Sequence, residues 1–95
     1  MYSDDRFEWS IVKSDETYRR RGFDFAFASC IFDSLHTEDF DEAHDRDEDR
    51  CLCVGRVNGR FVTVVYAQRG ERKRIISAWL SSSEEIDGYA RAFGN

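Results

Sequence analysis

The chain has 95 residues, 35% of them charged, and a formal net charge of −5 at pH 7. This length predicts one domain, spanning residues 1–95, with room for a hydrophobic core. No apolar run is long enough to cross a membrane and no signal-peptide pattern follows Met1, so the sequence predicts a cytoplasmic protein that makes no membrane contact.

The first part of the chain is predicted to form a short strand and a helix. Residues 1–6 are polar and are expected to be frayed, whereas Phe7–Trp9 is predicted to be an edge strand. Ser10 is a good N-cap for a helix over Ile11–Arg21, which should end at Gly22. The arginines at positions 19–21 complement the dipole of this helix, and the sequence leaves open whether they also contact RNA or a protein partner.

A second helix is predicted after Asp24, which is another good N-cap. Its apolar side chains recur at helical spacing and are expected to face the core. They are Phe27, Ala28, Cys30, Ile31 and Phe32. Residues 35–40 are predicted to add a short strand.

Three further strands are predicted over residues 51–57, 61–67 and 75–80. Asn58 and Gly59 separate the first two, and this dipeptide is the best able to adopt a type I′ hairpin turn. The turn fixes a register that pairs Val57 with Arg60 and Arg50 with Ala67.

Because side chains alternate across a sheet, this register predicts two faces, both largely apolar. One face carries Arg50, Leu52, Val54, Phe61, Thr63 and Val65, and the other carries Cys51, Cys53, Val62, Val64 and Tyr66. Arg72 and Arg74 share one side of the last strand, and Arg50 joins them if the second hairpin has the matching register.

The C-terminal segment is predicted to be an amphipathic helix. Ser82 and Glu85 form a capping box, and Gly94 is a typical helix end. An apolar stripe of Ile86, Tyr89, Ala90 and Phe93 either packs on the sheet or receives a partner. The predicted fold is therefore α+β: a small antiparallel sheet of three to four strands plus a short N-terminal strand, packed with two N-terminal helices and one C-terminal helix.

Charge is divided along the chain. Residues 33–49 contain nine acidic residues and one arginine, whereas residues 50–79 contain seven basic residues and one glutamate. The basic segment is suited to phosphates, and the acidic segment repels them.

The cysteines do not predict a metal site or a disulfide. Cys51 and Cys53 are two positions apart on one strand, and no second cysteine pair completes a zinc pattern. We interpret Cys30, Cys51 and Cys53 as small core residues, and we predict neither a metal nor a cofactor.

Several short motifs, taken in order, resemble one family. They are Phe7-Glu8-Trp9 with Lys13, the basic pair before Gly22, Phe32-Asp33, Glu48 with Arg50, Val64-Val65-Tyr66 and Arg74-Ile75-Ile76-Ser77-Ala78, followed by Glu85 and Tyr89. Their order and spacing resemble the BrnT family of small bacterial toxins, which have a RelE-like ribonuclease fold. The resemblance implies RNA cleavage, growth arrest and a stable complex with a ribbon-helix-helix antitoxin. It also implies contact with DNA only through that antitoxin, and assemblies of higher order with it.

The chain differs from the family pattern at three positions. Arg21 stands where histidine is usual, Thr17 where asparagine is usual, and Trp79 where arginine is usual. A histidine supplies a proton-transfer group and an arginine supplies a phosphate contact. These differences leave a second interpretation open, namely a weak or inactive toxin that only binds its antitoxin.

Metal-independent RNA cleavage needs groups that stabilise the phosphate as negative charge builds up and groups that move protons. The predicted catalytic residues are Arg50, Arg72 and Arg74, with Lys13 as a further phosphate contact and Glu48 or His44 for proton transfer. The predicted RNA-binding residues are Arg20, Arg21, Arg69 and Trp79. A rival interpretation uses the acidic segment, including Asp39, Asp41, Glu42, Asp45 and Asp47, to bind a divalent metal ion.

Overall fold

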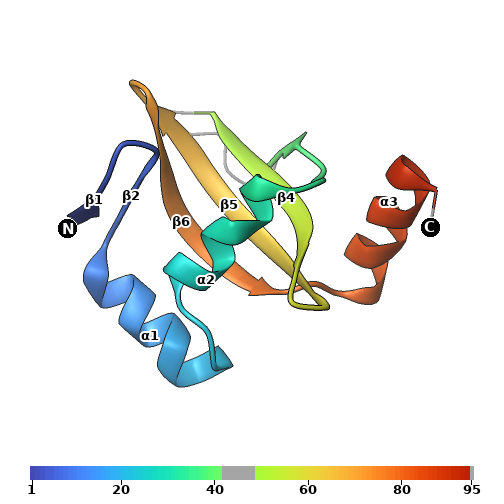
Figure 1. The fold of residues 1–95 in the computed structure, drawn as a ribbon, viewed down its shortest axis with the longest axis horizontal. Helices are drawn as coiled ribbons and strands as arrows, with labels where there is room; N and C mark the ends of the chain where they lie inside the picture. The colour runs from blue at the N-terminus through green and yellow to red at the C-terminus, as the bar shows by residue number, and fades with distance from the viewer. Residues whose placement is uncertain (42–48, 95) are drawn as a thin grey trace.

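The computed structural model describes residues 1–41 and 49–94. Within them, six strands form one mixed sheet, in the order β1-β2-β6-β5-β4-β3 (Figure 1). The strands are β1 (Tyr2–Ser3), β2 (Phe7–Trp9), β3 (Asp39–Phe40), β4 (Arg50–Val57), β5 (Arg60–Arg69) and β6 (Arg72–Leu80). The helices are α1 (Ile11–Arg21), α2 (Phe25–Ser29) and α3 (Ser83–Phe93), with a 3₁₀ turn, η1, over Cys30–Asp33. The α+β class is confirmed, and no helix of the described part is long and apolar enough to span a membrane.

The β4–β5 hairpin has the predicted register. Val57 pairs with Arg60 and Arg50 with Ala67. Asn58 has φ 51° and Gly59 has φ 82°, the positive values that the turn requires. This turn chemistry is local, which is why the sequence alone predicts the pairing correctly.

The N-terminal strand is not an edge strand, and the sheet is not purely antiparallel as predicted. β2 pairs in parallel with β6, and β1, formed by residues expected to be frayed, pairs with the outer side of β2. The ring of Tyr2 stacks on Trp9 with centroids 4.3 Å apart. Asp4 Oδ1 accepts the backbone N–H groups of Arg6 and Phe7, each at 2.8 Å, which orders the turn between the two strands.

The β5–β6 pairing contains a β-bulge between Val65 and Tyr66, which the sequence did not predict. Val65 pairs with Ser77 and Tyr66 with Ile75, so Ile76 is the extra residue. The bulge turns Ile75 and Ala78, three positions apart, toward the same core, where both are 2% exposed. On the opposite face it places Ser77 on the same side as Arg74.

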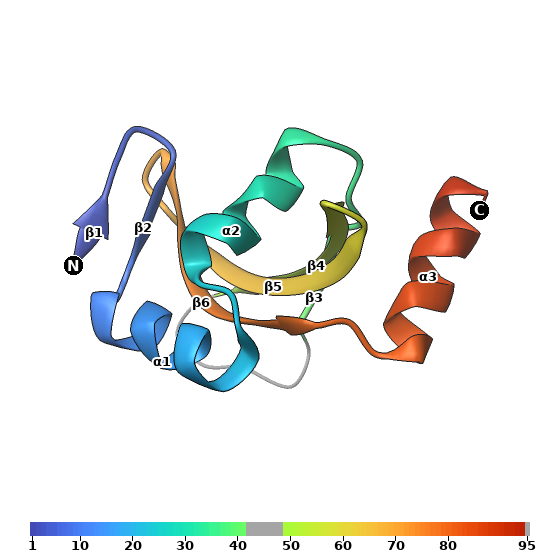
Figure 2. The same cartoon turned by 60° about the horizontal axis from the view of Figure 1, so that its bottom comes forward.

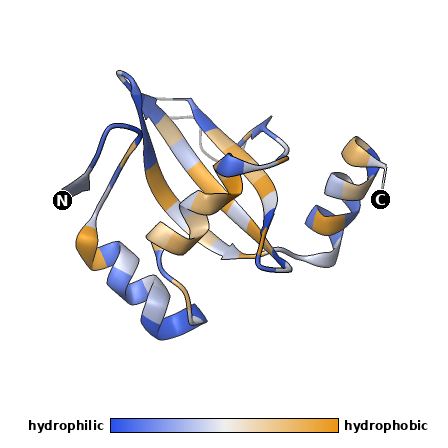
Figure 3. Cartoon of the chain, viewed as in Figure 1, coloured by the Kyte–Doolittle hydropathy of each residue, from blue (hydrophilic) through white to orange (hydrophobic). Residues whose placement is uncertain are grey.

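The core lies between the sheet and the segment formed by α2 and η1. Phe25, Ala28 and Ile31 are all 0% exposed and pack on strand residues such as Val62 and Val64. Figure 3 shows hydrophobic residues concentrated in α2 and in the strands that it crosses, while α1 is mostly hydrophilic.

One of the three cysteines predicted in the core is not there, because Cys30 is exposed. The chain tightens to a 3₁₀ turn at this residue, and 3₁₀ geometry repeats every three residues. The inward positions therefore become 25, 28 and 31, and the thiol of Cys30 turns away from the core.

The two longer helices flank this core. α1 has the predicted N-cap, Ser10, and ends at Gly22; its Ser14 Oγ accepts the N–H of Phe25 at 3.0 Å. α3 has the predicted capping box and packs through Tyr89, whose ring lies 5.2 Å from that of Phe61. Figure 2 shows α3 standing at the opposite end of the molecule from α1 and β1.

Candidate functional site

Three adjoining cavities form a basic groove on the sheet face opposite α2. They have volumes of about 270, 500 and 100 Å³, and Lys13 and Ile76 line all three. Because these two residues are shared, we treat the cavities as one surface, called the basic groove below. It runs from the end of α1, across β6, to the start of β4.

Four of the predicted site residues meet in the 270 Å³ cavity. Lys13 comes from α1, Arg50 from β4, Arg69 from β5 and Arg74 from β6. The matching register on which this depended is present, since Arg50 and Arg74 both pair with Ala67, one from each side. Two strand spacings of about 4.8 Å separate Arg50 from Arg74, so two long guanidinium side chains can reach one phosphate between them.

A carboxylate holds one of these arginines. Arg74 Nη1 lies 3.4 Å from Glu8 Oε2, with the side chains 29% and 17% exposed. Glu8 reaches Arg74 because the parallel pairing of β2 with β6 sets the two residues opposite one another. This role of Glu8 could not be predicted from the sequence, because no local pattern indicates that β2 pairs with β6.

Trp79 lines the 500 Å³ cavity together with Lys13 and Arg50. A residue of α3, Glu85, holds the indole ring of Trp79 in position. Its Nε1–H donates to Glu85 Oε1 at 3.1 Å. The same oxygen accepts the Thr63 hydroxyl at 3.0 Å and the Ser82 N–H at 2.8 Å. With its N–H bonded inside the protein, the indole offers the groove an apolar ring. The capping box had already accounted for Glu85, so its contact with Trp79 was not foreseen.

The remaining predicted arginines lie farther out. Arg20 and Arg21 line the 100 Å³ cavity beside Lys13. Arg72 does not line these cavities: its Nε donates to the backbone oxygen of Asp4, beside the β5–β6 turn. Arg72 and Arg74 are thus neighbours on one strand with different surroundings.

The groups predicted for proton transfer lie outside the described residues: Glu48 and His44, as well as Glu42, Asp45 and Asp47 of the rival metal site. Asp41 does line the groove, beside Lys13 and Arg50, where its backbone N–H donates to Arg50 O at 2.8 Å. Sequence reasoning considered Asp41 only as a metal ligand. Among residues 1–41 and 49–94, no three His, Cys, Asp or Glu side chains are grouped as a metal site.

Tyr66 faces the core instead of the groove. Burial raises the pKa of its hydroxyl, and the hydrogen bond that it donates to Glu38 Oε2, 2.5 Å away, raises it further. A phenol held protonated on the other side of the sheet is not a base for this groove. What the groove offers is a cluster of cations from four elements beside an aromatic ring, an arrangement suited to a phosphate-bearing ligand with stacked bases.

A search of curated proteins found no match to the chain. Residues 9–85 do match a family model whose description is "Ribonuclease toxin, BrnT, of type II toxin-antitoxin system". This range includes Lys13, Arg50, Arg74 and Trp79, and it covers most of the chain, as the resemblance in the sequence predicted. The chain therefore belongs to the BrnT family of ribonuclease toxins of type II toxin-antitoxin systems.

Proposed function

We propose that the basic groove binds single-stranded RNA and cleaves it without a metal ion. The observation that carries this proposal is the meeting of Lys13, Arg50, Arg69 and Arg74 around one cavity. These cations come from four elements that are separated in the sequence. Arginines that were merely exposed along one strand would not be gathered around a single cavity in this way. The RelE-like fold implied by the resemblance stays a prediction, which the helices on both sides of the sheet support.

The proposed reaction is attack by the 2′-oxygen on the adjacent phosphorus. The P–O5′ bond breaks, which leaves a 2′,3′-cyclic phosphate and a free 5′-hydroxyl. Arg50 and Arg74 stabilise the negative charge on the five-coordinate phosphorus, because guanidinium groups hold two oxygens and stay charged. A base takes the 2′ proton and an acid returns one to the 5′ oxygen; Asp41, Glu48 and His44 are the candidates.

We propose that the indole ring of Trp79 stacks on the nucleobase next to the cleaved phosphate. Stacking of a base on an aromatic side chain contributes about 1–3 kcal/mol and tolerates any base. We expect Trp79→Phe to keep most of the RNA affinity and Trp79→Ala to lose about tenfold, measured by fluorescence anisotropy with a labelled RNA. Equal affinities for these two variants would remove Trp79 from the proposed interface.

The test of cleavage uses two neighbouring arginines as a matched pair. The purified chain, Arg74→Gln and Arg72→Gln are each incubated with a defined RNA in excess EDTA, and the products are examined for cyclic phosphate ends. We expect Arg74→Gln to lose at least about tenfold in rate, since charged hydrogen bonds contribute about 1.5–3 kcal/mol, whereas Arg72→Gln keeps most of the rate. Equal losses in the two variants would contradict the groove as the active site.

Absence of cleavage by the folded parent chain would instead favour a toxin that only binds its antitoxin. Protein binding would then be the role of Arg21, Arg50 and Trp79. In either case we propose a ribbon-helix-helix antitoxin as the partner, with DNA bound only through it, higher-order assemblies of the two, and the cytoplasm as the place of action.

A further inference from the structure

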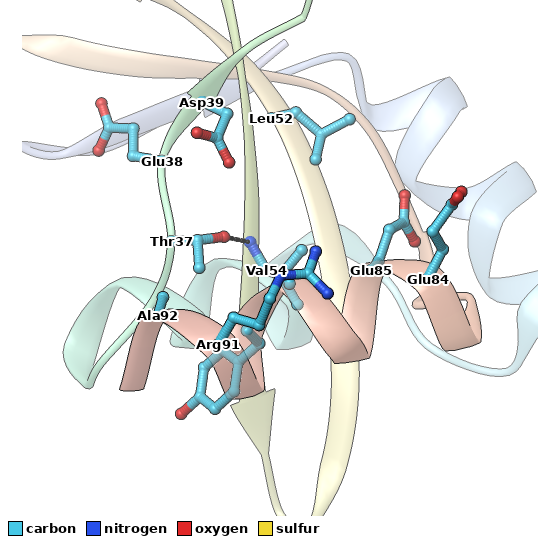
Figure 4. A pocket seen from close by; sticks show the side chains of 11 residues that line it. Thr37, Glu38, Asp39, Leu52, Val54, Glu84, Glu85, Arg91 and Ala92 are labelled. Atoms are coloured by element: carbon cyan, nitrogen blue, oxygen red, sulfur yellow. Dashed lines mark hydrogen bonds between the residues drawn. The ribbon is translucent and has the colours of Figure 1, made fainter. Parts of the chain in front are cut away.

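A second groove lies on the same side of the sheet, between α3 and the β3–β4 edge. It has a volume of about 630 Å³. Leu52, Val54 and Tyr89 provide its apolar surface. On the α3 side, Gly88 and Ala92 have little or no side chain, which leaves open space beside the helix. Figure 4 shows these elements, with the side chains of β3 and α3 on opposite sides of the opening.

The rim of this α3 groove is acidic. Asp39 stands on the β3 side and Glu84 on the α3 side, against a single basic lining residue, Arg91 (Figure 4). Glu38 and Glu85 also line the groove, although the Glu38 carboxylate accepts the Tyr66 hydroxyl and the Glu85 carboxylate accepts the Trp79 indole N–H. Both Asp39 and Glu84 are exposed to solvent. The charge is therefore opposite in sign to that of the basic groove, and it disfavours a nucleic acid.

We propose that the α3 groove binds a basic amphipathic helix of the antitoxin. An apolar floor between two acidic rims matches a helix that buries its apolar face and carries lysine or arginine on both flanks. The stripe on α3 is only partly used within the chain: Tyr89 is buried, but Ile86, Ala90 and Phe93 are half-exposed. This inference deepens the proposed function by assigning the surface that its partner occupies.

The position of the groove explains how such binding would neutralise the toxin. Leu52 lines both the α3 groove and the cavity that contains Trp79 and Arg50. An antitoxin bound in the α3 groove therefore needs to extend past only one side chain, Leu52, to cover the basic groove. Its main affinity need not come from the arginines that bind RNA.

The test compares two double variants with the same change in net charge. The groove variant is Asp39→Lys with Glu84→Lys; the control variant is Asp5→Lys with Asp87→Lys. Asp5 and Asp87 are exposed, and neither lines the groove, although Asp87 lies on the same helix as Glu84. The probe is the purified protein encoded by the reading frame next to the toxin gene, and its dissociation constant is measured by calorimetry.

A third variant, Ala92→Trp, fills the groove without changing its charge, and melting curves check that every variant is folded. We expect the groove variant and Ala92→Trp to bind the antitoxin at least about tenfold more weakly, or 1.4 kcal/mol, and the control variant to bind nearly as the parent does. Parent-like affinity in either the groove variant or Ala92→Trp overturns the inference.

RNA cleavage by the same preparations separates this inference from the proposed function. None of the three variants changes a residue of the basic groove, so each should cleave RNA as the parent does. If the groove variant and Ala92→Trp lose antitoxin binding while the parent chain binds the antitoxin but never cleaves RNA, the nuclease is refuted and the docking surface stands.

Discussion

Gly55 in β4 is predicted to be intolerant of a single added methyl group. A Cβ built at this position lies 2.7 Å from Ile31 Cβ, 3.2 Å from Ile31 Cγ2 and 3.3 Å from His36 Cβ. Its φ is not positive, so the glycine is required by the close approach of η1 and not by its backbone conformation. The variant Gly55→Ala isolates this packing contact.

The size of the effect follows from these distances. Carbon atoms normally meet at about 3.5–4.0 Å, so η1 must retreat by roughly 1 Å from β4 to make room for the added methyl group. Overpacking of this kind costs about 1–3 kcal/mol. For a domain of this size each kcal/mol lowers Tm by about 4–8 °C, so Gly55→Ala should melt at least about 4 °C below the parent.

The assay is urea unfolding followed by tryptophan fluorescence, to which Trp79 and the buried Trp9 both contribute, together with thermal melting. Gly88→Ala is the control, because a Cβ there meets only Arg91 Nη2 at 3.8 Å. Alanine is favoured over glycine inside a helix by about 1 kcal/mol, so this variant should be slightly more stable than the parent. A Gly55→Ala variant with the parent's urea midpoint would refute the tight contact between β4 and η1.

Three further predictions concern other parts of the chain. Glu85→Ala leaves the Trp79 indole N–H without its acceptor and removes one of the two hydrogen-bond partners of the buried Thr63 hydroxyl, the other being Ser81 Oγ. It should cost about 1–3 kcal/mol in urea unfolding, with Glu85→Gln losing less; a parent-like Glu85→Ala would contradict the network. Alkylation should modify the exposed Cys30 at once and the buried Cys53, whose pKa burial raises, only on unfolding; equal rates would contradict the burial. Hydrogen bonds from Tyr2 and from the Arg6 and Phe7 N–H groups lower the pKa of Asp4 below its ordinary 3.8. Its carboxylate therefore adds stability above that pH and loses it as the pH falls further below 3.8. The urea midpoints of the parent and Asp4→Asn should therefore differ near neutral pH and converge in acid.

Much of the sheet was predictable because its signals are local. The Asn58-Gly59 turn alone fixed which residues of β4 and β5 face each other, and this put Arg50 on the correct face. Ser10, Gly22 and Ser82 marked helix ends for the same reason: a cap acts within one turn of the chain.

What sequence reasoning missed depends on contacts between distant segments. The parallel pairing of β2 with β6 joins residues more than sixty positions apart, and it supplies the Glu8 contact to Arg74. The contact of Glu85 with Trp79 and the α3 groove likewise depend on where α3 settles against the sheet. Alternation along a strand also assumes regular pairing, so it had no means of anticipating the shift at Ile76.

That shift separates the two halves of β6 in a way that bears on changes of chain length. Arg74 precedes Ile76, and Ser77 and Trp79 follow it, and each half keeps its own inward and outward alternation. Loss of one residue from a regular strand such as β5 would turn half of it over. Loss of Ile76 would bring Arg74 and Ser77 to ordinary two-residue spacing and leave both on the groove side. The bulge therefore allows β6 to lose one residue without turning Arg74, Ser77 or Trp79 away from the groove.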